Sequence, residues 1–186
     1  MLGDDEADEY LFLPELKRAS YAANAADLTR AIKENKSKML VYYAAVAMKK
    51  YGTQKSVPLL KGLLDYPKVD IKIVSLIAIA NIAGNKEKDL YIQLLSGRNT
   101  DMRLYSMAII WQLDIKEALP QVVRLAEDIL GNRIKYRLEW RFYPLYIIEY
   151  LQRHPQEGAD VLARLQKRYH KENWNLKDAI LRLIGR

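Results

Sequence analysis

Residues 133–153 hold the densest mixture of basic and aromatic side chains in the chain. Guanidinium groups pair with phosphate oxygens through two hydrogen bonds, and aromatic rings stack on nucleobases, so such a mixture suits a nucleic-acid surface. The candidate contact residues here are Arg133, Lys135, Arg137, Trp140 and Arg141. Their alternation spreads them around a helix rather than aligning them, which weakens the case for one patch and favours basic side chains that face solvent.

The same segment carries a second pattern, because part of it has the spacing of a buried helix face. Tyr143, Ile147, Tyr150 and Leu151 recur at helical steps and predict a core stripe. Pro144 is expected to open this helix. The neighbouring bases are then either a solvated edge of a packed helix or a surface for an acidic partner.

Another group of bases lies further along the chain at helical spacing. Arg164, Lys167, Arg168 and Lys171 share one face of a helix. Like charges on one face repel one another unless water or an anionic partner screens them. This group is therefore either a solvated basic face or a contact surface for phosphates or for an acidic protein.

No catalytic or metal-binding constellation is predicted. The chain has no cysteine, and its two histidines, His154 and His170, form no His-Glu pair at ligand spacing. The eight glycines are scattered and form no phosphate-binding loop. We therefore expect no metal, no cofactor and no enzyme activity. The lack of cysteine suits a reducing compartment.

Charge is divided unevenly along the 186 residues. Residues 1–20 hold six acidic and two basic side chains, whereas residues 131–186 hold twelve basic and six acidic ones. The acidic start lacks the basic residues and apolar run of a signal peptide, and the longest charge-free apolar run, 39–48, falls short of the roughly 20 residues that span a bilayer. The sequence predicts a cytoplasmic protein with no membrane role, whose basic C-terminal third favours acidic partners.

The elements that would position these side chains follow from an internal repeat of 31 residues. The period superposes apolar or small residues, as in the set Leu40, Ile71 and Met102 and the set Ala44, Ser75 and Ser106. Within each unit, apolar positions recur at helical spacing, stop at a polar break and then recur again. Pro58 and Pro120 lie in the first turn of second helices, where a missing N–H costs nothing. Each unit is therefore a predicted helical hairpin, and no segment is typical of a strand.

This pattern resembles the HEAT-repeat family of α-solenoids, in particular the short bacterial HEAT-like repeats of about 30 residues. The family's first helix carries an apolar residue, a basic residue and then small residues at fixed steps, as in Met102, Arg103 and Ser106. Val41 departs from this pattern at the basic position, and Asp114 replaces the glycine usual at the turn. The resemblance implies an all-α fold, a right-handed α-α superhelix of HEAT/armadillo type with about four helical hairpins plus a half unit at each end.

We expect a single HEAT-like domain over 1–186, with regular repeats at 37–130. The flanking parts are an acidic N-terminal segment and cap, 1–20, and atypical basic repeats, 131–186. Atypical end units are common in repeat proteins because they close the stack. Further helices are expected at 25–35, 144–153, 157–169 and 175–184, with a break at 155–158.

The predicted first helices, 39–48, 73–80 and 104–111, contain no charged residue on any side. Either they are covered by neighbouring helices and leave a modest apolar strip at Ala45, Leu76 and Met107, or that strip is a partner or self-association surface. Trp111 falls just off the inward stripe. Its indole is expected either to lie exposed or to cover the junction with the next unit.

A curved helical surface without convergent titratable groups favours recognition over chemistry. We therefore expect a non-enzymatic protein-binding scaffold or regulatory adaptor. The alternative is nucleic-acid binding through the basic C-terminal third. The resemblance also implies an enzyme alternative, since some HEAT-like solenoids are alkylpurine DNA glycosylases that hold a lesion between tryptophans beside a carboxylate. Trp111 with Asp114, and Trp140 with Arg141, could supply such parts.

Overall fold

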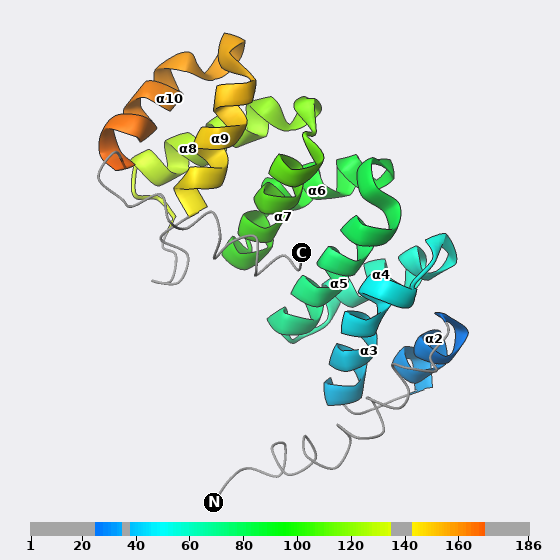
Figure 1. The fold of residues 1–186 in the computed structure, drawn as a ribbon. Coiled ribbons are helices and arrows are strands. Elements are labelled where there is room, and N and C mark those ends of the chain that lie inside the picture. The colour runs from blue at the N-terminus through cyan, green and yellow to red at the C-terminus, as the bar shows by residue number, and fades with distance from the viewer. Residues whose placement is uncertain (1–24, 35–37, 135–142, 170–186) are drawn as a thin grey trace, which may run out of the picture. The chain divides into compact units, whose positions relative to one another are not determined.

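The computed structural model describes residues 25–34, 38–134 and 143–169, and the elements in these ranges are all helical (Figure 1). The predicted all-α class is confirmed. The chain divides into two compact units, Met1–Lys88 and Asp89–Arg186, which are described in turn. The superhelical arrangement and the single domain over 1–186 stay predictions.

The first unit is built around the central helix α3 (Lys38–Tyr51). It contacts α2 (Ala25–Glu34) and α5 (Val69–Ala83), and α4 (Val57–Gly62) lies against α5. α3 and α5, the predicted first helices of successive repeats, lie side by side in Figure 1. The 3-10 turns of this unit are Gln54–Ser56, Leu63–Asp65 and Gly84–Glu87.

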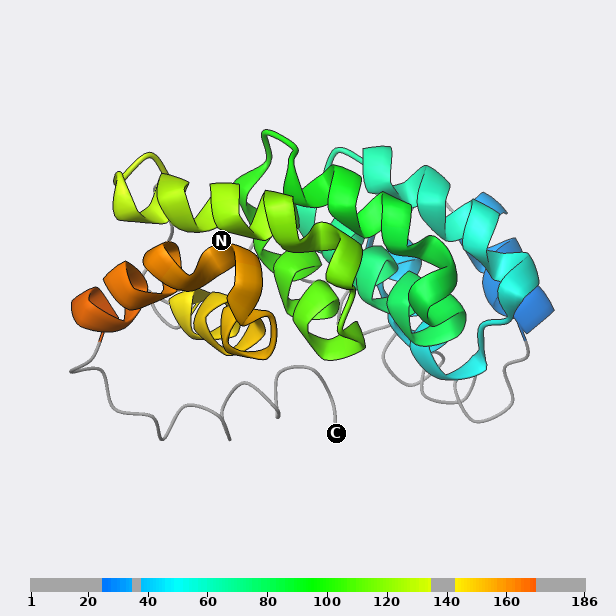
Figure 2. The same cartoon turned by 90° about the horizontal axis from the view of Figure 1, so that it is seen from above.

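The second unit begins within α6 (Lys88–Leu95) and continues through two pairs of helices. These are α7 (Thr100–Leu113), α8 (Leu119–Leu130), α9 (Tyr143–Arg153) and α10 (Pro155–Tyr169). α7 packs beside α9, and α8 packs beside α10 (Figure 2). α9 also contacts α8 and α10, which places it at the centre of this unit.

The turns lie where the polar breaks and prolines of the sequence predicted them. Each of α4, α6 and α8 is entered through a short 3-10 turn at the predicted break, at Gln54–Ser56, Gly84–Glu87 and Lys116–Ala118. Pro58 and Pro120 lie in the first turns of α4 and α8, as predicted. Asn99 caps α7, because its side chain accepts a hydrogen bond from the Met102 amide at 3.1 Å.

The C-terminal end of α7 requires a left-handed residue. Asp114 stands there with φ 51° and ψ 49°, the conformation that glycine adopts most easily. Its amide still donates to carbonyl groups of the last turn of α7. The replacement of glycine by Asp114 therefore preserves the turn and adds a carboxylate to it.

The predicted break at 155–158 is wrong. α9 ends at Arg153, a single bend residue follows at His154, and Pro155 already begins α10. Proline is tolerated at a helix start because its fixed φ and missing N–H suit that position. Gly158 lies within α10 and lets it approach α9 closely, since a Cβ there would come within 2.7 Å of Leu151 Cδ2.

The core contains the residues expected from the helical spacing. The predicted stripe of α9, formed by Tyr143, Ile147, Tyr150 and Leu151, is fully buried. The small positions of the repeat are filled by Ser75 and Ser106, which are also fully buried. Ala45, Leu76 and Met107 were expected to leave an apolar strip on the surface, but each is completely buried.

Candidate functional site

The structure describes about half of the candidate contact residues. Arg133, Arg164, Lys167, Arg168 and Trp111 lie within its range. The candidates outside the described residues are Lys135, Arg137, Trp140, Arg141 and Lys171. Of the basic and aromatic segment 133–153, the structure therefore describes residues 133–134 and 143–153.

Arg168 binds the C-terminal end of α8. Its Nη1 donates to the carbonyl groups of Ile129 at 3.3 Å and Leu130 at 2.9 Å, and its Nη2 donates to Asn132 Oδ1 at 2.6 Å. The last carbonyl groups of a helix have no partner within the helix and carry the negative end of its dipole. Arg168 thus caps α8 from the neighbouring helix α10.

Arg164 lies one turn earlier on α10 and pairs with Glu127 of α8. The contact is bidentate, with Nη1–Oε1 at 2.8 Å and Nη2–Oε2 at 3.0 Å. Asp160 lies 3.4 Å from the same Nη1. The hydrogen bonds to Glu127 raise the pKa of the Arg164 guanidinium.

Asp128, the next residue of α8, joins two further arginines. Its Oδ2 accepts from Arg103 Nη2 of α7 at 2.8 Å, and its Oδ1 accepts from Arg133 Nε at 2.9 Å. Arg103 also donates from Nε to the Leu95 carbonyl at the end of α6, at 3.0 Å. The side chain of Arg133 is 64% exposed, so this pair lies at the surface.

Three of the candidate bases therefore converge on one place, the last turns of α8. We call this group, Arg133, Arg164 and Arg168 with Glu127, Asp128 and Asn132, the α8-end cluster. Of the bases that share a face of α10, Arg164 and Arg168 contact α8, although both are exposed, as Lys167 is. Sequence spacing identified the shared face but carried no information on the acceptors opposite.

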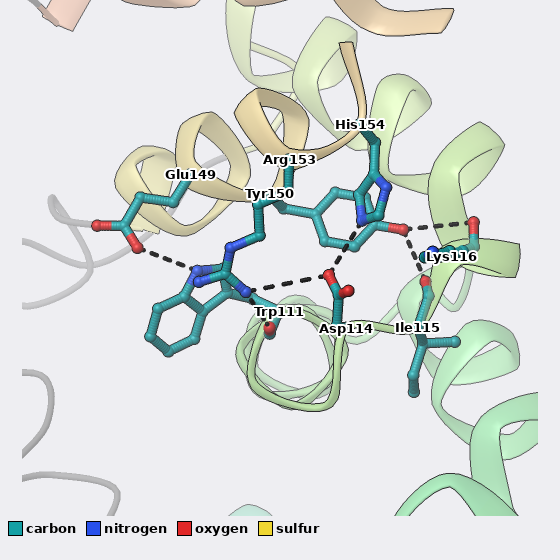
Figure 3. A network of polar contacts seen from close by, with 8 residues as sticks. All are labelled: Trp111, Asp114, Ile115, Lys116, Glu149, Tyr150, Arg153 and His154. Carbon is teal, nitrogen blue, oxygen red and sulfur yellow. Dashed lines mark hydrogen bonds and ion pairs between the residues drawn. The ribbon is translucent and has the colours of Figure 1, made fainter. Parts of the chain in front are cut away.

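Trp111 forms the centre of a second polar network, at the junction of α7 and α9 (Figure 3). Its side chain is buried, with 9% exposed, and the indole N–H donates to Glu149 Oε2 at 3.1 Å. The Arg153 guanidinium lies 5.3 Å above the indole ring and donates to the Trp111 carbonyl at 3.2 Å. Of the two positions expected for this indole, the structure has the one that covers the junction.

Asp114 belongs to the same network and faces the end of α9. Its Oδ1 lies 3.1 Å from His154 Nε2 and 4.0 Å from Arg153 Nη1. Tyr150 donates to the Ile115 carbonyl at 2.6 Å, and its ring lies beside the His154 imidazole. Of the four residues proposed for a lesion pocket, Trp111 and Asp114 are thus in contact with α9 side chains, whereas Trp140 and Arg141 lie outside the described residues (Figure 3).

Three buried tyrosines of α9 contact residues of these polar groups or their neighbours. Tyr143 donates to the Arg103 carbonyl at 3.1 Å, and Tyr146 stacks edge-on against Trp111 with ring centres 5.0 Å apart. Burial raises the pKa of Tyr143, Tyr146 and Tyr150, because the ionised phenolate loses hydration inside the protein. Tyr143 and Tyr150 therefore act as neutral hydrogen-bond donors, and Tyr146 packs its ring against Trp111.

The first unit carries a different kind of surface, made of apolar side chains that are partly exposed. Tyr42 and Val46 of α3 and their equivalents one repeat later, Ile73 and Ile77 of α5, are half-buried. Lys38 and Lys49 stand at the two ends of this row on α3, because residues 38, 42, 46 and 49 follow one helix face. We call these six residues the α3–α5 stripe.

The described ranges contain neither a cluster of possible metal ligands nor a helix that could span a membrane. Among them, no group of three or more histidine, aspartate or glutamate side chains is arranged to hold a metal ion. No helix in the described ranges is long and apolar enough to cross a bilayer.

Comparison with protein-family models, with curated proteins and with solved structures found no match to this chain.

Proposed function

We propose that this protein is a non-enzymatic protein-binding scaffold, a HEAT-like stack of helical hairpins that binds a partner through the α3–α5 stripe. The observation that carries the proposal is the apolar character of that stripe. α3 has no charged residue between Lys38 and Lys49, and α5 has none between Lys72 and its end at Ala83. Surface helices ordinarily present charged residues to water, and a contiguous apolar surface with a charged rim is typical of a protein interface.

The contacts of the α8-end cluster weigh against the nucleic-acid alternative. Phosphate binding depends on cationic side chains that can leave water for a phosphate oxygen. Arg164 and Arg168 instead hold acceptors of α8. Exchanging these contacts for phosphate contacts would leave Glu127 and the end of α8 without their partners.

The glycosylase alternative meets a similar obstacle at Trp111. A base-excision site needs an open aromatic wall and a carboxylate that faces the lesion. The Trp111 indole is buried under Arg153, and the Asp114 carboxylate faces His154. The described geometry thus favours a structural role for both side chains.

The proposal is tested by capturing partners from native lysate with the full chain and with two double variants. Val46→Glu/Ile77→Glu places two negative charges on the α3–α5 stripe, and Lys55→Glu/Lys86→Glu reverses two charges at exposed positions elsewhere in the same unit. We expect the first variant to lose a captured protein that the second retains. Circular dichroism of both variants checks that the helices remain.

The nucleic-acid alternative is tested by a separate binding measurement. Binding of single- and double-stranded oligonucleotides is measured at low and at moderate salt, because phosphate contacts weaken steeply as salt rises. Oligonucleotide binding that persists at moderate salt, and that Lys167→Gln with Arg133→Gln reduces, would replace the scaffold proposal. Equal protein capture by the two double variants would also contradict it.

A further inference from the structure

We infer that the α3–α5 stripe is the docking site for the chain's own N-terminal segment, residues 9–15. The docking itself stands on the structure and the sequence. Its regulatory consequence, competition with a partner for the same surface, rests on the proposed function.

The stripe has a defined order of side chains along α3. Lys38 begins it, Tyr42 and Val46 follow, and Lys49 ends it. Ile73 and Ile77 of α5 widen the apolar part, since they occupy the equivalent positions one repeat later. The surface therefore has an apolar middle and a positive charge at each end of α3.

Residues 9–15 have the complementary order. Glu9 is followed by four apolar residues, Tyr10 to Leu13, then by Pro14 and Glu15. Four more acids stand just before this segment, at positions 4, 5, 6 and 8. An apolar group of side chains with an acid at each side matches an apolar stripe with a lysine at each end.

The lengths of the two patterns agree. Lys38 and Lys49 are eleven residues apart in α3, which corresponds to about 16 Å along the helix axis. Glu9 and Glu15 are six residues apart, and six residues of extended chain span about 20 Å. Each of the two acids can therefore lie near one of the two lysines while residues 10–13 cover the apolar middle.

The connection to the folded unit is long enough. The nine residues 16–24 lead into α2, and α2 packs against α3. Nine extended residues reach about 30 Å, and α3 is about 21 Å long. Either end of the stripe is then within reach, and an attached segment has an effective concentration of about millimolar, so weak contacts suffice for docking.

Charge also supports this occupant over an unrelated apolar segment. α3 carries no acidic residue, and α5 carries one, Asp70, in its first turn. The lysines of α3 therefore favour an acidic segment, and salt should weaken the contact because these charges are near the surface. An apolar segment without acids would gain nothing from Lys38 and Lys49.

Disulfide trapping in the full chain tests the inference, because the chain has no cysteine of its own. Phe12→Cys is combined with Ile77→Cys on the stripe, or with Lys55→Cys, an exposed position of the same unit away from the stripe. Under a mild oxidant, we expect the intramolecular disulfide to form about tenfold faster with position 77, although that position is the more buried. Equal rates with positions 77 and 55 would overturn the inference.

Charge reversal adds a readout that a freely moving tail would not give. Lys38→Glu/Lys49→Glu should slow trapping at position 77 to the rate of the control, and Glu9→Lys/Glu15→Lys in the same chain should restore it. Reversal without effect would contradict the proposal, and so would disulfide-linked dimers that increase with protein concentration, since the occupant would then be a second copy. Lys55→Glu/Lys86→Glu is the matched control.

The two proposals fail separately. If trapping occurs as expected but no protein is captured through the stripe, the docking stands and the scaffold function does not. If a partner is captured through the stripe while trapping rates are equal, the scaffold function stands and the docking does not. Where both hold, Phe12→Ala/Leu13→Ala should raise the capture of the partner, because it removes the competitor.

Discussion

Arg103 of α7 and Asp128 of α8 form an ion pair, with Arg103 Nη2 2.8 Å from Asp128 Oδ2. The same guanidinium donates to the Leu95 carbonyl at the end of α6, and the Arg103 carbonyl accepts from the Tyr143 hydroxyl of α9. One residue thus joins four helices of the second unit. Its side chain is 18% exposed, so these hydrogen bonds are largely protected from water.

Replacing Arg103 should destabilise the second unit. In Arg103→Gln the Leu95 carbonyl and the Asp128 carboxylate lose a charged donor, and we expect a loss of about 2 kcal/mol in the free energy of unfolding. Arg124→Gln, at an exposed position of α8, is the control and should change it by less than about 0.5 kcal/mol. Chemical denaturation measures both, and similar values for the two variants would contradict the role assigned to Arg103.

Two glycines should respond to alanine in opposite directions. Gly158→Ala places a Cβ within 2.7 Å of Leu151 Cδ2, and because Leu151 is fully buried, the shift of its side chain or of α10 should cost about 1–2 kcal/mol. Gly62 ends α4 with open space around its Cα, so Gly62→Ala should add about 0.5–1 kcal/mol. The midpoint of thermal unfolding should therefore fall in Gly158→Ala and rise in Gly62→Ala, each compared with the unchanged protein. A stabilising Gly158→Ala would show that α9 and α10 are further apart.

The buried serines of the repeat should tolerate loss of their hydroxyl groups. Ser75 Oγ and Ser106 Oγ are buried and have no hydrogen-bond partner among the described residues. Ser106→Ala removes an unsatisfied polar group, so stability should stay equal or rise by up to about 1 kcal/mol, and Ser75→Ala should behave alike. A clear loss of stability in denaturant titrations would reveal a partner for the hydroxyl.

Stability should fall at alkaline pH. Tyr143, Tyr146 and Tyr150 have pKa values raised by burial in the folded state, whereas an unfolded tyrosine ionises near its ordinary pKa of about 10. Above that pH the unfolded chain binds fewer protons than the folded one, so the free energy of unfolding decreases as pH rises toward the folded pKa values. Below it, these tyrosines contribute no pH dependence.

This pH effect can be followed by denaturant titrations at a series of alkaline pH values, together with the ultraviolet absorbance of tyrosinate. Tyr146→Phe should reduce the slope of stability against pH, because it removes one of the three raised groups. Tyrosinate absorbance that reaches its full value while the helical signal remains intact would contradict the assigned burial.

Much of the fold was predictable from the sequence because it depends on local rules. The period of 31 residues, the prolines at positions 58 and 120 and the polar breaks identified the helices and their order. The core stripe of α9 followed from helical spacing at Tyr143, Ile147, Tyr150 and Leu151, and all four are buried. Pro155 was misread as a break, because a proline that starts a helix and one that interrupts it look alike in one sequence.

The sequence by itself determined which side chains share a helix face, since that depends on 3.6 residues per turn. It placed Arg164 and Arg168 on one face of α10 and left their partners open. The tertiary structure alone decided that this face meets Glu127 and the end of α8, because such contacts join residues more than thirty positions apart. The same holds for the Trp111 indole, whose burial depends on α9 packing over it, a relation that helical spacing within α7 does not contain.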